Sequence, residues 1–219
     1  MFDTAITAEQ FFLALHDTLL MVSISLVIGS LIGIPLGIYL VVTRPGGLIH
    51  NRVVYAIINP LVNIVRSLPF IILMITIIPF TRLIVHTTIG IPGAIVPLII
   101  FIAPYIARLV ENSLLDVDTG ILEAAKSMGA TPLQAVWHFL LPEALSSLIL
   151  ALTTATIGLI GATAMAGTVG GGGIGDLAIT YGYQRFDVFA TWTTALVLIV
   201  IVQLLQSLGN YLARRIRRE

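Results

Sequence analysis

Residues Thr18 to Thr43 read TLLMVSISLVIGSLIGIPLGIYLVVT, a run without a single charged side chain. A helix of about 20 residues, rising about 1.5 Å per residue, crosses the ~30 Å hydrocarbon core of a bilayer, so this run is long enough to span it. Asp3 and Glu9 precede it and the first basic residue is Arg44, which is unlike the basic start of a cleavable signal peptide. We therefore expect this segment to remain as a transmembrane helix.

The rest of the chain has the same character. Apolar residues make up 58% of it and charged residues only 10%, with a mean hydropathy of +1.04, which is typical of a membrane protein rather than a soluble domain. Charge-free windows recur at 83–107, 144–175 and 188–213, and the window 53–81 is interrupted only by Arg66. We expect one all-α polytopic membrane domain over residues 1–219, with five transmembrane helices near 12–42, 55–81, 89–108, 144–168 and 188–212. Prolines in and beside the first three spans predict bent or broken helices there.

The distribution of basic residues predicts the orientation. With the N-terminus outside, eight Lys or Arg residues fall on the inner side and two, Arg82 and Arg185, on the outer side. Because cytoplasmic loops carry the excess of Lys and Arg, we expect a multi-pass membrane protein with its N-terminus outside and its C-terminus in the cytoplasm. The inner residues are Arg44, Arg52, Arg108, Lys126, Arg214, Arg215, Arg217 and Arg218.

The longest hydrophilic stretch, Arg108 to Glu143, lies on the predicted cytoplasmic side and reads as two short helices around a glycine. Asp118 or Thr119 can cap the first helix, and Gly129 stands where a C-terminal cap requires a left-handed residue. Thr131, Pro132 and Gln134 form a capping-box start for the second helix, and Pro142 is expected to close the unit. On these patterns alone, the loop at 116–142 could be only a surface connection.

The complete string EAAKSMGATPLQAVWHFLLP, residues 123–142, resembles the EAA loop of ABC-importer permeases. Three further strings resemble the methionine-uptake permeases: NIVRSLPFIILMITIIPFTR (63–82), APYIARLVENSLL (103–115) and AMAGTVGGGGIGDLAITYGY (164–183). The resemblance implies a type I importer fold and a coupling helix that sits in a groove of a cytoplasmic ATPase. It assigns the ATPase contact to Glu123, Ala124, Ala125, Lys126, Gly129, Ala130, Thr131 and Pro132, with the small residues allowing close approach and Glu123 and Lys126 at the rim.

The resemblance also implies a location in the bacterial cytoplasmic (inner) membrane, and it implies the partners. They are a second copy of the chain, two ABC ATPase subunits that bind Mg-ATP, and an extracytoplasmic methionine-binding protein. The permease itself would need no cofactor, and we expect no nucleic-acid partner. The substrate assignment rests on the more distributed strings, so a permease for another small solute remains an alternative.

Two residues are candidates for the transport pathway. Arg66 is the one charge inside the five apolar windows, which suggests function, but it could also anchor at the interface or pair between helices. Met165 is the large flexible side chain in a run of small residues in the fourth span, where small residues usually indicate close helix packing. Asp17 and Asp176 fall at predicted outer boundaries, where solvated caps compete with contacts to a binding protein.

The sequence excludes several other classes. It contains no cysteine, its four histidines stand apart, and it has no P-loop, H-E-x-x-H string or paired acids within a span, so we expect neither a metal site nor catalytic residues. ATP hydrolysis must then come from another chain. A passive channel would share the topology without needing a coupling loop.

Overall fold

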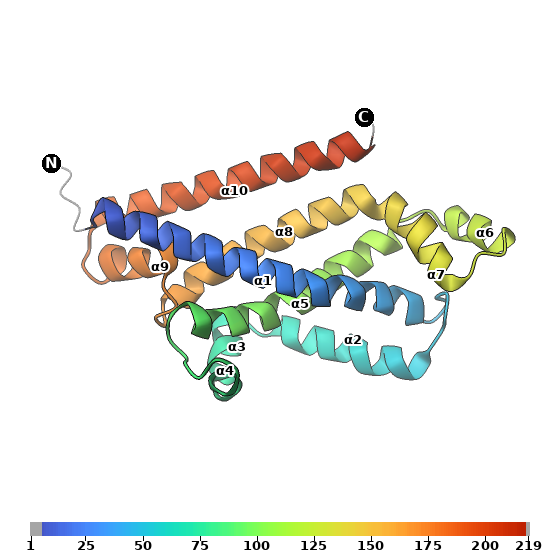
Figure 1. The fold of residues 1–219 in the computed structure, drawn as a ribbon, viewed down its shortest axis with the longest axis horizontal. Helices are drawn as coiled ribbons and strands as arrows, with labels where there is room; N and C mark the ends of the chain where they lie inside the picture. Colours follow the sequence, from blue (N-terminus) through green and yellow to red (C-terminus); the bar gives the residue numbers. More distant parts are fainter. Residues whose placement is uncertain (1–5, 218–219) are drawn as a thin grey trace.

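The computed structural model describes residues 6–217, and this part of the chain is entirely helical (Figure 1). Arg218, which the charge count includes, lies outside the described residues. The first helix starts at a Thr7–Gln10 capping box, in which each side chain bonds the other residue's backbone N–H. The elements are α1 (Ala8–Thr43), α2 (Arg52–Ser67), α3 (Phe70–Thr76), α4 (Ile78–Val85), α5 (Gly90–Leu115), α6 (Thr119–Ser127), α7 (Pro132–Ala135), the π-helical segment η1 (Val136–Leu140), α8 (Leu141–Gly167), α9 (Gly173–Leu177), the π-helical segment η2 (Ala178–Tyr183) and α10 (Val188–Arg217).

The second expected span is not one straight helix. The chain turns by 106° between α2 and α3, so the described residues contain four helices long enough to cross a membrane, or five spans if this bent pair counts as one. Pro69 has no N–H to continue α2, and Leu68 before it adopts extended backbone with φ −84° and ψ 130°. The proline signal predicted this break, and the bent pair lies largely within the expected second span at 55–81.

A stripe of glycines packs α1 against α5. Gly29, Gly33 and Gly37 recur every four residues, so they lie on one face of the helix, and all three are buried. A Cβ on Gly33 would lie 2.6 Å from the carbonyl oxygen of Ala103, and one on Gly37 would lie 2.5 Å from that of Ala107. The two backbones therefore approach more closely than any side chain would permit, as in other small-residue contacts between membrane helices.

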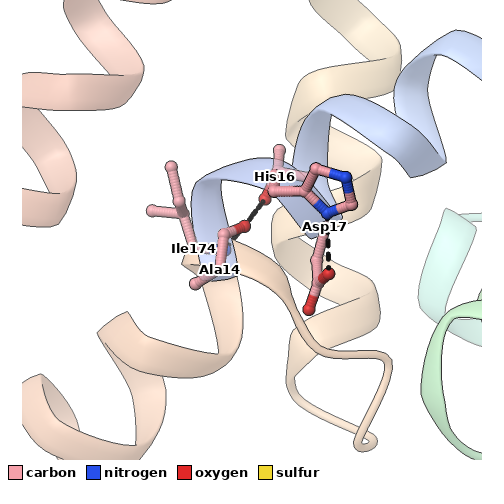
Figure 2. Close-up of polar contacts among 5 residues, drawn as sticks. Ala14, His16, Asp17 and Ile174 are labelled. Carbon is pink, nitrogen blue, oxygen red and sulfur yellow. Dashed lines mark hydrogen bonds and ion pairs between the residues drawn. The ribbon is translucent and has the colours of Figure 1, made fainter. Parts of the chain in front are cut away.

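The glycine-rich segment after α8 folds the short helix α9 back against α1 and α8 (Figure 1). Gly170, Gly172 and Gly173 have φ values of 80°, 81° and 83°, which other residues rarely adopt. Figure 2 shows Ala14 of α1 beside Ile174 of α9. The buried Thr18 hydroxyl donates to the Ala14 carbonyl oxygen at 3.0 Å and accepts from the Ile174 N–H at 2.9 Å. One hydroxyl thus satisfies an N–H at the start of α9 that has no helical partner.

We expect Thr18→Val to lower the stability of the folded protein by about 1–3 kcal/mol, because it leaves the buried N–H of Ile174 without an acceptor. Thr18→Ser keeps the hydroxyl and is the matched control. Thermal unfolding of the two purified variants in detergent measures the difference. Equal midpoints would show that this hydrogen bond contributes nothing to stability.

The last helix packs on α8 and leaves most of its surface open. Its membrane-spanning window is only 11% buried. A Cβ on Gly209 would collide with the Thr153 side chain, and Ser146 donates a 3.1 Å hydrogen bond to the Ala213 carbonyl oxygen. The large apolar side chains exposed on α10 are chiefly leucine, isoleucine and valine, which suit contact with lipid.

Candidate functional site

The hydrophilic loop at 116–142 folds as a compact unit at the end of the bundle where α10 ends (Figure 1). The Asp118 carboxylate accepts from the Gly120 N–H at 2.7 Å and caps α6. Gly129 follows that helix with φ 73°, the left-handed conformation predicted for its cap. Thr131 and Gln134 form the predicted capping box at the start of α7. The local sequence signals therefore account for the turn.

The prediction that Pro142 closes this unit is wrong. The second short helix continues through the π-helical segment η1 into α8, so that residues Pro132–Gly167 form one long apolar helix. Pro142 stands in the first turn of α8, where its missing N–H is tolerated, and the wider π turn before it accommodates the interrupted ladder. The loop is thus directly continuous with a membrane-spanning helix.

The assigned contact residues do not all face outward. Glu123, Ala124 and Lys126 are exposed, as are Gly129, Thr131 and Pro132, and Ala130 is half-buried. Ala125 is the one buried residue of α6, with 0% exposure, and α6 packs on α7 and η1. Ala125 therefore holds the two short helices together and does not form part of the outer surface.

Three large apolar side chains project from this unit, and the sequence reasoning missed them. Met128 is 66% exposed, Leu133 69% and Trp137 61%. Exposed apolar patches on a hydrophilic loop indicate contact with another protein. The signal that could have identified them is the presence of large apolar residues within the longest hydrophilic stretch of the sequence.

The fourth span has two faces with different roles. Ala162, Ala166 and Gly167 are buried, and a Cβ on Gly167 would collide with the backbone of Asp176 in α9. The opposite face is open, because a Cβ on Gly161 would meet nothing within 4 Å in the described chain and Met165 is 49% exposed. The close packing predicted from small residues therefore holds for one side only. The open face consists of Leu150, Thr154, Gly158, Gly161, Met165 and Thr168.

Arg66 lies beside an aromatic group near this open face. Its guanidinium carbon is 5.9 Å from the centroid of the Tyr105 ring, at the limit of a cation–π contact. The Tyr105 ring also stacks on Phe101 and lies 3.9 Å from the Cβ position of Gly158. Arg66 is exposed, and within the described chain it makes no ion pair.

A polar cluster between α2 and α5 was not predicted. Arg108 forms an ion pair with Glu111 one turn further along α5, and these side chains are 16% and 4% exposed. The Arg108 Nη2 also donates to the side-chain oxygens of Asn59 and Asn63, at 2.7 Å each. The sequence spacing could have indicated the pair within α5, but nothing in it placed α2 alongside.

The described residues contain no group of three or more His, Asp or Glu side chains arranged to hold a metal ion. His16 is paired with the neighbouring Asp17 carboxylate at 3.4 Å, in the N-terminal part of α1 (Figure 2).

Comparison with known proteins matches nearly the whole chain to one family. Residues 12–218 match the model of the family described as binding-protein-dependent transport system inner membrane component. The chain is 48% identical to the probable D-methionine transport system permease protein MetI of Vibrio cholerae over 97% of its length and 94% of the relative's. It is 52% identical to the D-methionine transport system permease protein MetI of Escherichia coli K12 over 69% of its own length and 70% of that protein.

Solved structures give the same result. A chain of the inward-facing MetNI methionine ABC transporter matches with a TM-score of 0.93 at 44% identity, covering 96% of this chain and 99% of that one. A chain of an amino acid ABC transporter determined with histidines shares the fold, with a TM-score of 0.78 at 19% identity. The type I importer fold, the exposed loop unit and the family match over residues 12–218 lead to one conclusion: this chain belongs to the binding-protein-dependent transport system inner membrane components, the permease subunits of ABC importers.

Proposed function

We propose that this chain is the transmembrane permease subunit of an importer that carries methionine into the cytoplasm. The observation that carries the substrate assignment is the likeness over nearly the whole chain, at 44–48% identity, to proteins named as methionine permeases and to a permease from a methionine transporter. The chain is not itself an enzyme, since the family's ATPase is a separate subunit.

Two copies of the chain would enclose the pathway, with two ATPase subunits below it and an extracytoplasmic binding protein above it. Mg-ATP would bind the ATPase subunits. The positive-inside distribution supports an inner-membrane orientation with α6 and α7 in the cytoplasm. The binding protein would then dock at the opposite end of the bundle, where α1 begins and α9 lies (Figure 1).

The loop unit of α6 and α7 would couple ATP hydrolysis to transport. Its exposed Met128, Leu133 and Trp137 would anchor it in the ATPase, with Glu123 and Lys126 as polar contacts around them. Because α7 continues through η1 into α8, a displacement of the unit would move the pathway helix directly. ATP can shift the transporter between outward-open and inward-open states only by binding them with different affinity, and this unit would carry that difference.

The open face of α8 would line the pathway against the second copy of the chain. Gly158 and Gly161 leave room there, and Met165 would act as an adaptable gate because its unbranched thioether side chain can repack. Arg66, beside Tyr105 and Gly158, would lie at the margin of the same route. Two apposed copies would bury the side chains that are exposed in one.

Deletion of the gene for this chain should abolish high-affinity methionine uptake, and the wild-type gene should restore it. Radiolabelled methionine uptake, with other amino acids as unlabelled competitors, measures the effect. Inactivating the partner ATPase should stop uptake to the same extent, which a passive channel would not show. If methionine uptake persists and another solute's uptake disappears, the methionine assignment is wrong and the importer assignment stands.

A further inference from the structure

The helix α2 is weakly attached to the rest of the bundle. Val62 is its only buried residue, and most of its apolar side chains are exposed, among them Val53, Ile57, Leu61 and Ile64. It follows a loop at its start and ends at the sharp Leu68–Pro69 break. Its position therefore depends heavily on the few contacts that it makes with α5 and, to a smaller extent, with α1.

The most specific of these contacts is polar. Asn59 and Asn63, four residues apart on one face of α2, both accept from the same guanidinium nitrogen of Arg108 at 2.7 Å. The charge partner of Arg108 is Glu111, which belongs to the same helix, α5. If α2 moves away, the ion pair stays together and only the bonds from a cation to neutral amides are broken.

This arrangement differs from an ordinary salt bridge between helices. Separating two opposite charges in a buried site leaves each uncompensated, which is strongly unfavourable. Here the charge is compensated within α5 in either position of α2, and hydrogen bonds donated by an ion are still stronger than neutral ones. The hydrogen bonds from Arg108 are therefore strong enough to order α2. Breaking them does not carry the cost of separating two buried opposite charges, so α2 can leave and return.

We propose that Arg108 is a positioning residue that holds α2 against α5 in a reversible clamp, and that this clamp opens and closes during the transport cycle. α5 leads directly toward the coupling unit, since Glu111 precedes the first residue of α6 by eight positions. Movement of the coupling unit would therefore act on the clamp, and α2 would swing about the Leu68–Pro69 break. This inference rests on the proposed transport function for its place in the cycle.

The test uses single cysteines, since the native chain has none. Val62→Cys is placed at the buried contact, where the native side chain is 3% exposed, and Val53→Cys is its control on the same helix, where the native side chain is 69% exposed. In the complete permease–ATPase complex in lipid nanodiscs, N-ethylmaleimide should label Val62→Cys slowly without nucleotide and about tenfold faster during ATP turnover, because an accessible, ionised thiol is the reactive form. Val53→Cys should react at the same rate in both conditions.

Two substitutions shift the clamp in opposite directions. Asn59→Asp is nearly isosteric and adds a charge to Arg108 from the other helix, so it should remove the ATP-dependent rise in Val62→Cys labelling and slow uptake by about tenfold while leaving complex abundance unchanged. The double variant Asn59→Leu/Asn63→Leu should raise labelling without nucleotide and increase ATP hydrolysis per molecule transported.

A static contact would give a different result. Equal Val62→Cys labelling in all nucleotide states, together with wild-type uptake by Asn59→Asp, would overturn the proposal. The labelling assay needs only ATP and the intact complex. It therefore tests whether the clamp opens even if the transported solute is not methionine. An experiment that contradicts the methionine assignment can therefore be distinguished from one that contradicts the clamp.

Discussion

Gly33→Leu should prevent the permease from folding, and little of the variant should accumulate in the membrane. The Cβ of any other residue at this position would lie 2.6 Å from the Ala103 carbonyl oxygen and 2.8 Å from the Ile106 Cβ. The obstacle is backbone as well as side chain, so α1 and α5 would have to separate along their contact. Overpacking of this kind costs about 3 kcal/mol or more, a large part of the stability of a typical domain.

A pair of alanine substitutions separates this steric effect from the general effect of removing a helical glycine. Gly33→Ala and Gly161→Ala make the same chemical change in two membrane helices, but the second adds its methyl group to open space in the described chain. Membrane abundance and thermal unfolding should fall for Gly33→Ala and change little for Gly161→Ala. Equal behaviour of the pair would mean that α1 and α5 do not depend on their close approach.

The sequence predicted the features that depend on neighbouring residues. Apolar length identified the long helices, the Thr131–Gln134 box identified a helix start, and Gly129 identified the cap between α6 and α7. Each of these is decided within a few residues along the chain. Resemblance over the loop and three other strings then identified the family that the comparisons show.

The features that the sequence could not predict depend on which helices become neighbours. Ala124 and Ala125 are adjacent and of the same type, yet Ala125 is fully buried and Ala124 is exposed. Gly167 packs against α9 while Gly161 faces open space on the same helix. The partners of Arg108 on α2 could not be predicted from the sequence either, because Asn59 and Asn63 precede it by more than forty residues. Side-chain type predicts a possible contact, and only the assembled bundle selects the partner.

Gly129→Val should abolish uptake while the protein still reaches the membrane. Gly129 has φ 73°, a conformation that costs other residues about 1–2 kcal/mol and is least tolerated by β-branched ones. Its Cβ position faces open space in the described chain, so the new side chain would not disturb the permease's own packing. It would project instead from the surface between α6 and α7, where Met128 and Leu133 are also exposed. The spans keep their full apolar length, so insertion should be nearly normal.

Backbone strain and steric interference with the ATPase can be distinguished at this position. Asn tolerates the left-handed conformation, so Gly129→Asn tests the effect of an added side chain on the ATPase contact without backbone strain. Gly129→Ala adds backbone strain with almost no bulk. If the surface is the ATPase contact, Asn and Val should both reduce co-purification of the ATPase and uptake, and Ala should retain most of both. If only the turn matters, Ala and Val should be impaired and Asn should transport normally. Full ATPase recovery and wild-type uptake with all three substitutions would contradict the coupling role, since a tightly fitted contact could not accept three different side chains at its centre.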